Sequence, residues 1–260
     1  MTGDPHADRE PAGPPKSVLA RGLTLLDAFG ADEELRLADL AARTGLPKPT
    51  THRLLAELVA WGGVERTGTG YRLGTTLFRL GQRVTRHQRL RTAAMPYLED
   101  LYESTRENVH LAVPDGVDTL FIEKLAGRAS TPILSGVGGT LPGYCTATGK
   151  LFLALDGDRM RSLLSGASGG LQRFTARTIV SPRRLYEDLS ETAGRGYGIN
   201  LGEAEDGVVA VAAPVRDATG EVIAAISVTG YVRRLDLRRL TPVVRTAARG
   251  LTAQLGVRAR

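Results

Sequence analysis

The residues best suited to chemistry form two groups. The first group combines cations, hydroxyls and an imidazole: Lys48, Thr50, Thr51, His52 and Arg53, followed by Arg66 and Arg72. Such side chains bind phosphate oxygens and the edges of bases. The second group is uncharged and includes Ser227 and Thr229, whose hydroxyls point to one face if the segment is a strand. The first group therefore suggests nucleic-acid binding, and the second either a polar pocket or hydroxyls satisfied within a core.

Several segments resemble enzyme motifs but depart from them at necessary positions. The stretch from Gly143 to Lys150 approximates a phosphate-binding loop, but Tyr144 stands where glycine is required and Leu151 where Ser or Thr is required. The glycines at 194–198 follow a predicted helix instead of opening one, unlike a dinucleotide fingerprint. The spacing gives no reason to pair Cys145 with His110. We therefore expect no catalytic residue, and a protein that is not an enzyme.

The composition also argues against metals, cofactors and membranes. Cys145 is the single cysteine, and no two of the four histidines have the i, i+4 spacing of a helical metal site. No run approaches the roughly 18 apolar residues that span a bilayer. Residues 1–16 are proline-rich and lack the apolar region of a signal peptide, so we predict a disordered leader. We expect a cytoplasmic protein with no metal, no cofactor and no membrane contact.

The excess of basic over acidic side chains is concentrated in the N-terminal third of the 260-residue chain. Residues 17–91 carry 12 basic and 7 acidic side chains, whereas residues 92–260 carry 20 and 18. From Arg66 to Arg91, seven arginines follow one another with no acidic residue between them. This surplus indicates a polyanion such as double-stranded DNA as the partner of this part of the chain.

The elements that must position the first group are three short helices and a hairpin. Ser17 caps a helix with apolar residues Val18, Leu19, Leu25, Leu26 and Phe29, and further helices are predicted over 37–44 and 49–61. Thr51 shares the inward spacing of Leu54, Leu55 and Leu58, which leaves Lys48, Thr50, His52 and Arg53 outward. Strands at 64–66 and 71–73 complete a winged helix-turn-helix over residues 17–74. Its third helix fits the major groove, and its wing arginines meet phosphate.

A linker helix is predicted over residues 75–91. Leu77, Leu80 and Val84 form an apolar stripe along it, with His87 at the next turn. The winged domain is too small to cover this stripe, so a partner subunit is the natural solution. The pattern therefore indicates a homodimer.

Residues 92–260 alternate between helical and extended patterns. Helices are predicted over 94–105, 145–155, 181–193 and 237–255, and strands over 108–113, 118–125, 208–215 and 222–229. The two last strands form a central hairpin. The fold class is therefore α+β: a winged helix-turn-helix followed by a mixed α/β domain around an antiparallel sheet.

The sequence resembles the IclR family of bacterial transcription regulators. The resemblance rests on Ala38 to Lys48, His52 to Leu55 and Tyr71 to Gly74, and continues through Leu141-Pro142, Ala147 to Lys150, Ala212 to Val215 and Ala225 to Gly230. It covers about 240 residues, and the segments follow the family's order and spacing. One departure is Pro49-Thr50-Thr51, where the family commonly has Ser-Thr-Val, so an operator sequence cannot be transferred from relatives.

The resemblance implies a GAF-like effector-binding domain over residues 92–260, dimers often paired into tetramers, and symmetric operators. It places effector contacts at Ala147, Thr148, Asn200, Ala210, Ser227 and Thr229. Separately, Leu141 and the start of the helix that follows it could direct free backbone N–H groups at a small anion such as a carboxylate. Relatives often carry Asp and Cys at positions 200 and 210, which predicts a less acidic and roomier pocket for a larger carboxylate or an aromatic ligand. Glu203 matches a nearby acidic position of the family, and a solvated loop charge is an equal alternative.

These observations predict a ligand-responsive DNA-binding transcriptional regulator. Two alternatives stay open at this level. One is a small-molecule enzyme with an appended DNA-binding domain. The other is a constitutive DNA-binding protein whose C-terminal domain only oligomerises.

Overall fold

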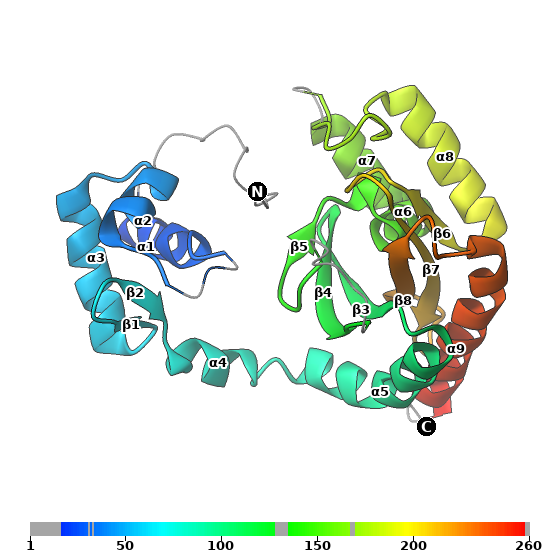
Figure 1. Cartoon of the computed structure of the whole chain (residues 1–260), viewed down its shortest axis with the longest axis horizontal. Helices are drawn as coiled ribbons and strands as arrows, with labels where there is room; N and C mark the ends of the chain where they lie inside the picture. Colours follow the sequence, from blue (N-terminus) through cyan, green and yellow to red (C-terminus); the bar gives the residue numbers. More distant parts are fainter. Residues whose placement is uncertain (1–16, 31, 33, 128–134, 167–169, 258–260) are drawn as a thin grey trace. The chain divides into compact units, whose positions relative to one another are not determined.

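The computed structural model describes residues 17–30, 32, 34–127, 135–166 and 170–257 (Figure 1). The chain divides into two compact units, residues 1–88 and 89–260, which are described separately below. The leader predicted for residues 1–16 lies outside the described residues.

The first unit contains three helices and a two-stranded wing. These are α1 (Val18–Asp27), α2 (Leu37–Thr44), α3 (Lys48–Trp61), β1 (Val64–Arg66) and β2 (Tyr71–Leu73). The Ser17 hydroxyl accepts a hydrogen bond from the Ala20 amide and caps α1, as predicted. Gly45 ends α2 with a φ of 65°, a conformation that glycine adopts without steric cost. Leu25, Phe29 and Leu55 are fully buried between the helices.

The outer face of α1 differs from the prediction. Val18 and Leu19 are 55% and 73% exposed, because the core of this small unit is already filled by Leu25 and Phe29 on the opposite side of the helix. Leu23 is also 53% exposed. The N-terminal half of α1 therefore presents an apolar surface to solvent.

The predicted single linker helix is wrong. The structure forms α4 (Thr75–Gly81) and α5 (Thr85–Thr105), and α5 also includes the helix predicted from residue 94. At the break, the Arg83 amide donates to the Leu80 carbonyl and the Val84 amide to the Gly81 carbonyl, so the backbone makes tighter i, i+3 turns. The low helix propensity of Gly81 and the β-branch of Val84 favour this interruption. Phe78, Leu80 and Val84 remain exposed.

The second unit is built around a six-stranded antiparallel sheet of order β5-β4-β3-β8-β7-β6. Its strands are β3 (Asn108–Asp115), β4 (Asp118–Leu125), β5 (Thr140–Leu141), β6 (Gly198–Leu201), β7 (Val208–Arg216) and β8 (Val222–Tyr231). The helices are η1 (Gly143–Cys145), α6 (Ala147–Leu155), α7 (Gly157–Gly166), α8 (Pro182–Arg195) and α9 (Leu237–Val257). The predicted hairpin is β7 and β8. Three elements were not predicted from the sequence: the short strands β5 and β6, and the weakly patterned helix α7.

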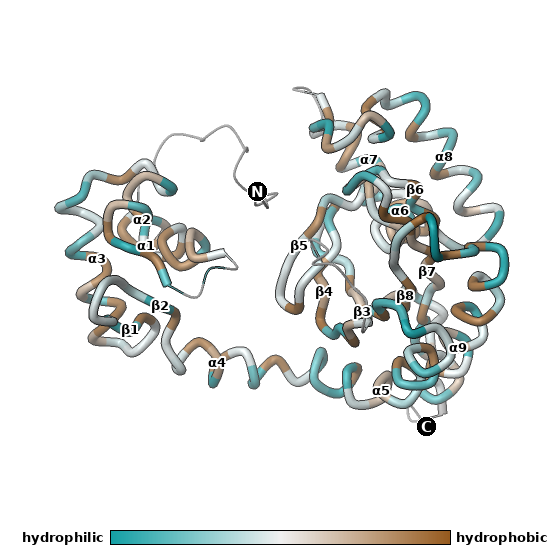
Figure 2. The backbone as a smooth tube through the Cα atoms, in the orientation of Figure 1, coloured by the Kyte–Doolittle hydropathy of each residue, from teal (hydrophilic) through white to brown (hydrophobic). Residues whose placement is uncertain are grey.

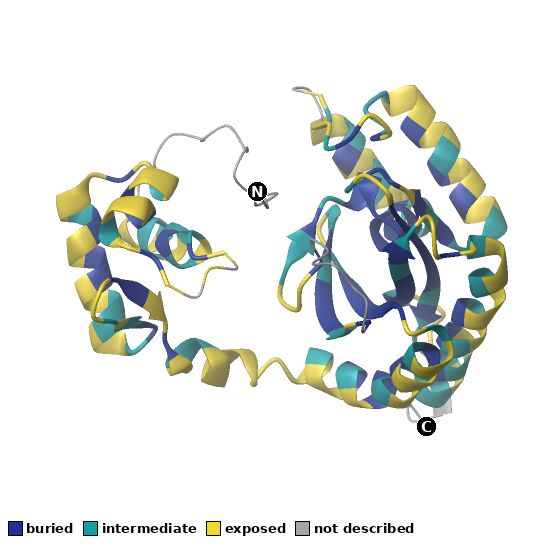
Figure 3. Ribbon diagram, in the orientation of Figure 1, coloured by how far each residue is buried: buried dark blue, intermediate teal, exposed yellow. Residues whose placement is uncertain are grey.

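The two faces of the sheet are covered differently. On one face, aliphatic side chains of β3, β7 and β8 pack against α5 and α9, which lie along the sheet in Figure 1 and form the main core. On the other face, Ala210, Ala212 and Ala225 pack under α6. Figure 2 shows this apolar content, and Figure 3 shows that the central strands are buried. The α+β architecture predicted from the sequence is confirmed.

The small residues under α6 allow it to lie close to the sheet. A Cβ atom added to Gly198 in β6 would lie 1.9 Å from the Ala147 carbonyl oxygen, so only glycine fits there.

Candidate nucleic-acid interface and ligand pocket

The N-terminal end of α3 presents polar side chains to solvent. Pro47 precedes the helix and Pro49 occupies its first turn, where a missing N–H costs no intrahelical bond. Lys48, His52 and Arg53 are exposed, and Thr50 is partly exposed. None of these side chains makes an ion pair within the described residues, so all four are free to meet a ligand.

Thr51 does not belong to this surface. Its side chain is fully buried, and its hydroxyl donates to the Pro47 carbonyl oxygen at 3.2 Å. The position faces inward, as its spacing indicated. The Thr51 hydroxyl, at a position where the family commonly has the apolar residue valine, is satisfied by this local hydrogen bond. Thr51 therefore cannot contact a nucleic acid through its side chain.

The two wing arginines differ in their surroundings. Arg66 is exposed and has no ion-pair partner among the described residues. Arg72 is also exposed, but its guanidinium donates two hydrogen bonds to Glu65 across the hairpin, at 2.9 and 2.7 Å. The Arg72 guanidinium is therefore held by Glu65, whereas Arg66 has no such pair among the described residues.

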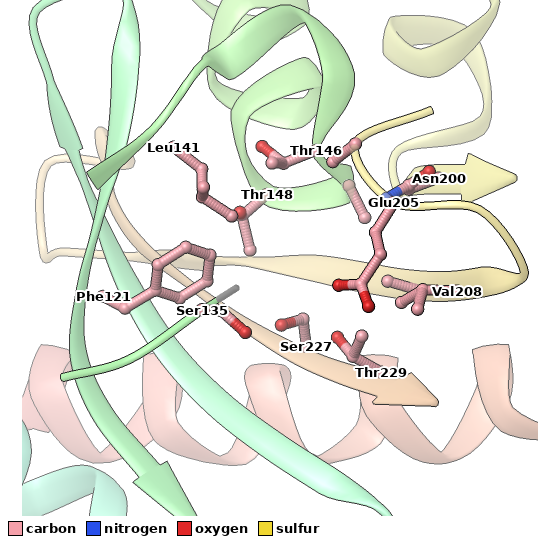
Figure 4. Close-up of a pocket in the computed structure, with 13 residues that line it drawn as sticks. Phe121, Ser135, Leu141, Thr146, Thr148, Asn200, Glu205, Val208, Ser227 and Thr229 are labelled. Atoms are coloured by element: carbon pink, nitrogen blue, oxygen red, sulfur yellow. The ribbon is translucent and has the colours of Figure 1, made fainter. Parts of the chain in front are cut away.

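The seven predicted effector-binding residues line one pocket of the second unit (Figure 4). The pocket lies at the N-terminal end of α6, above β7 and β8, and its lining consists of Phe121, Ser135, Leu141, Thr146, Ala147, Thr148, Asn200, Ala204, Glu205, Val208, Ala210, Ser227 and Thr229. Strand register explains the convergence, because Ala210 is paired with both Asn200 and Thr229 across the sheet. Paired residues of neighbouring strands share a face.

The start of α6 lines this pocket with Thr146, Ala147 and Thr148. The Thr146 hydroxyl accepts from the Gly149 amide at 3.1 Å and caps the helix. The amides of Ala147 and Thr148 belong to the first turn, where the helix itself supplies no acceptor. Unpaired first-turn amides and the helix dipole favour a carboxylate at this position.

The structure adds lining residues that the sequence analysis missed: Phe121, Ser135, Thr146, Ala204, Glu205 and Val208. The alternation of β4 places Phe121 on the pocket face and could have indicated it. Glu205 lies in the β6–β7 loop, which has no periodicity from which the direction of a side chain could be predicted. Its carboxylate points into the pocket in Figure 4. Glu205 brings a carboxylate that the comparison of positions 200 and 210 did not include, and a pocket less acidic than that of relatives stays a prediction.

The cavity of the pocket is small in this structure, and the predicted gain in room over relatives stays a prediction. Its cavity volume is about 40 Å³, enough for a few water molecules. An aromatic ligand must therefore displace lining side chains or move the elements around α6.

A buried ion pair between Lys150 and Glu203 contacts the pocket residue Asn200. Lys150 in α6 is 2% exposed and donates to Glu203 at 2.7 Å, with Asp188 of α8 at 3.1 Å from the same ammonium nitrogen. Burial raises the pKa of Glu203, although Lys150 counteracts this. The Glu203 amide in turn donates to the side-chain oxygen of Asn200, a pocket residue, at 2.8 Å. Glu203 is thus a structural partner of Lys150 and not a solvated loop charge.

Histidine and cysteine have separate roles in this unit. The Nε2 atom of His110 lies 2.9 Å from the Ser135 hydroxyl, while Cys145 donates to the Pro142 carbonyl at 3.4 Å. Burial raises the pKa of the Cys145 thiol above its ordinary value and lowers the pKa of His110 to about 3. An imidazole of such low basicity is a poor general base for the adjacent serine. The serine–histidine contact is therefore not an activated nucleophile.

Among the described residues, no group of three or more His, Cys, Asp or Glu side chains has an arrangement that could hold a metal ion. Within the same part of the chain, no helix has both the length and the apolar character that crossing a bilayer requires.

Comparison with known families matches both units. Residues 18–68 match the IclR helix-turn-helix domain, and residues 82–253 match the bacterial transcriptional regulator IclR C-terminal domain. The chain belongs to the IclR family. It is a transcriptional regulator with a helix-turn-helix DNA-binding domain and a C-terminal ligand-binding domain, and not an enzyme.

Relatives match along nearly the whole chain. The Pca regulon regulatory protein of Pseudomonas putida is 33% identical, with 98% of this chain and 87% of that protein covered. The transcriptional repressor IclR of Escherichia coli K12 is 33% identical, with 97% and 94% covered. Among solved structures, an IclR homolog from Microbacterium hydrocarbonoxydans complexed with 4-hydroxybenzoate has 31% identity and a TM-score of 0.82, with 94% and 100% covered.

Proposed function

We propose that this IclR-family regulator binds a symmetric DNA operator in the cytoplasm as a homodimer or a dimer of dimers, and that a carboxylate-bearing, aromatic metabolite in the α6 pocket controls this binding. The observation that carries the proposal is the pocket itself. Seven positions selected from the sequence line one cavity at a helix N-terminus, in a chain whose separate N-terminal unit exposes a basic helix end.

The DNA-binding part of the proposal rests on α3 and the wing. Lys48, Thr50, His52 and Arg53 occupy the end of α3 that enters a major groove in helix-turn-helix proteins. The fork of Arg53 suits bidentate contact with guanine, and Lys48 suits phosphate. Arg66 contacts the flanking backbone, and Arg72 does so once it leaves Glu65.

The ligand part of the proposal rests on the lining of the pocket. The carboxylate binds at the first-turn amides of Ala147 and Thr148, and Phe121 and Leu141 pack against an apolar ring. A related protein of 31% identity is complexed with 4-hydroxybenzoate, which supports this class of ligand. Because the cavity is about 40 Å³ here, the ligand has to enlarge it, and this movement links occupancy to the rest of the domain.

The homodimer is supported by exposed apolar surface on the first unit. Leu19 and Leu23 of α1 and Phe78 of α4 are 73%, 53% and 69% exposed. We expect a partner copy to cover exposed apolar side chains of this size. Two copies joined there carry two reading helices, which is what a symmetric operator requires.

The proposal is tested in two steps. Genomic footprinting first identifies bound sites, and fluorescence anisotropy then measures affinity for one such site with and without 4-hydroxybenzoate. We expect a change of about 5- to 150-fold, the usual range of coupling between two sites. Calorimetric titration with acetate and larger carboxylates completes the test. Preference for acetate, or operator affinity indifferent to every carboxylate, contradicts the proposed effector.

A further inference from the structure

The pocket has a second polar end that lies away from the α6 N-terminus. Thr146 and Thr148 line the side next to α6, whereas Ser135 and Ser227 lie on the side of the sheet (Figure 4). His110 of β3 is paired with Ser227 across the sheet and lies behind this second end. Neither Ser135 nor His110 is a contact of the proposed carboxylate site at the start of α6.

His110 is held as a neutral donor. Its side chain is fully buried, its ring meets Phe121 edge-to-face at 5.3 Å, and its Nε2 atom lies 2.9 Å from the Ser135 hydroxyl oxygen. Nδ1 is buried with no hydrogen-bond partner within the described residues. A neutral imidazole carries one N–H, and a buried N–H without an acceptor is rare and costly. The proton therefore belongs on Nε2, from which it is donated to Ser135.

This tautomer fixes what Ser135 can offer. A serine hydroxyl has one hydrogen and two acceptor positions. The His110 N–H occupies an acceptor position, so the Ser135 hydrogen remains available for another group. The ammonium group of Lys124 donates to the Ser135 carbonyl at 2.7 Å and holds the backbone of this residue in place. Ser135 is only 6% exposed and lines the pocket, so the group that can accept its hydrogen is a ligand in the pocket.

We propose that Ser135, oriented by His110, is a second recognition group of this pocket and selects ligands that carry an oxygen acceptor at the end remote from their carboxylate. Ser135 contacts the ligand, and His110 is a positioning residue. The inference rests on the proposed ligand-binding function and extends it, because it distinguishes between aromatic acids that bind the α6 end equally well.

The test compares two probes that differ by one oxygen, 4-hydroxybenzoate and benzoate, by calorimetric titration of the full chain. The wild type is expected to prefer 4-hydroxybenzoate by about tenfold, the effect of one buried hydrogen bond. In Ser135→Ala this preference disappears, because 4-hydroxybenzoate loses far more affinity than benzoate does. Ser104→Ala, at a hydroxyl of α5 that lies outside the pocket, is the matched control and keeps the preference.

His110 is tested by rescue. His110→Gln keeps a side-chain N–H donor and is expected to retain the preference, whereas His110→Leu loses it. Nitrogen NMR of the wild-type histidine provides a measurement that is independent of ligand, and is expected to show the neutral form protonated on Nε2. Protonation on Nδ1 overturns the inference.

The remaining outcomes separate the inference from the proposed function. Equal binding of both probes by the wild type overturns the role of Ser135 and leaves the carboxylate pocket intact. Loss of both probes in Ser135→Ala shows a merely structural serine and also overturns it. If neither probe binds the wild type, the aromatic-carboxylate ligand and the inference both fail.

Discussion

Arg53 has the exposure and position of a base-reading side chain, while its neighbour Thr51 is buried. We expect Arg53→Ala to reduce discrimination between operator and scrambled DNA by about 1–3 kcal/mol, because a bidentate contact with a base is lost. Arg53→Lys keeps the positive charge but lacks the two parallel N–H donors of the guanidinium, so it should also lose discrimination between operator and scrambled DNA. Fluorescence anisotropy on both DNAs measures the effect, and an equal loss on the two would reduce Arg53 to a phosphate contact.

His110 gives a pH dependence of stability at the same scale. Burial lowers its pKa from 6.5 to about 3, so between these values the unfolded chain binds a proton that the folded chain does not. Folding stability therefore falls as pH decreases through this window, by up to about 1.4 kcal/mol per pH unit. His110→Gln removes this contribution and should flatten the profile. Urea unfolding at several pH values checks this, and parallel profiles for the two proteins would contradict it.

At the scale of elements, α6 is attached to its surroundings through the Lys150 ion pairs. Lys150→Met leaves Glu203 and Asp188 without a cation in a buried site, which is expected to cost about 3–5 kcal/mol of unfolding free energy. Combining it with Glu203→Leu should recover part of this loss. Chemical denaturation measures both variants.

The matched control for Lys150 is Arg183→Met. Arg183 pairs with Glu187 on the surface of α8, so its loss should change stability little. If Lys150→Met is as mild as this control, α6 does not depend on the buried pair.

At the scale of the whole molecule, the proposed homodimer predicts that the exposed apolar surface of the first unit contributes to assembly. Phe78→Glu places a carboxylate on this surface and is expected to shift the protein toward the monomer. Operator affinity should then fall by about 100-fold or more, because the second half-site no longer binds in the same event. Analytical ultracentrifugation and anisotropy check the two effects. A Phe78→Glu protein that stays dimeric would place the interface elsewhere.

The sequence by itself determined the winged helix-turn-helix, the α+β class and the inward and outward faces of α3, because these depend on local periodicity and capping. It also indicated seven pocket residues, six of them through the family resemblance, and the strand register then pairs Ala210 with both Asn200 and Thr229.

Only the tertiary structure decided the rest. The break between α4 and α5 depends on a few competing backbone hydrogen bonds, and Ser135, Glu205 and His110 meet only through folding of segments that lie far apart in the chain. The burial of Lys150 with Glu203 across 53 positions follows the same logic. Local pattern fixes which way a side chain points from its own element, but which groups it then meets depends on the packing of distant elements, and no spacing in the sequence records that.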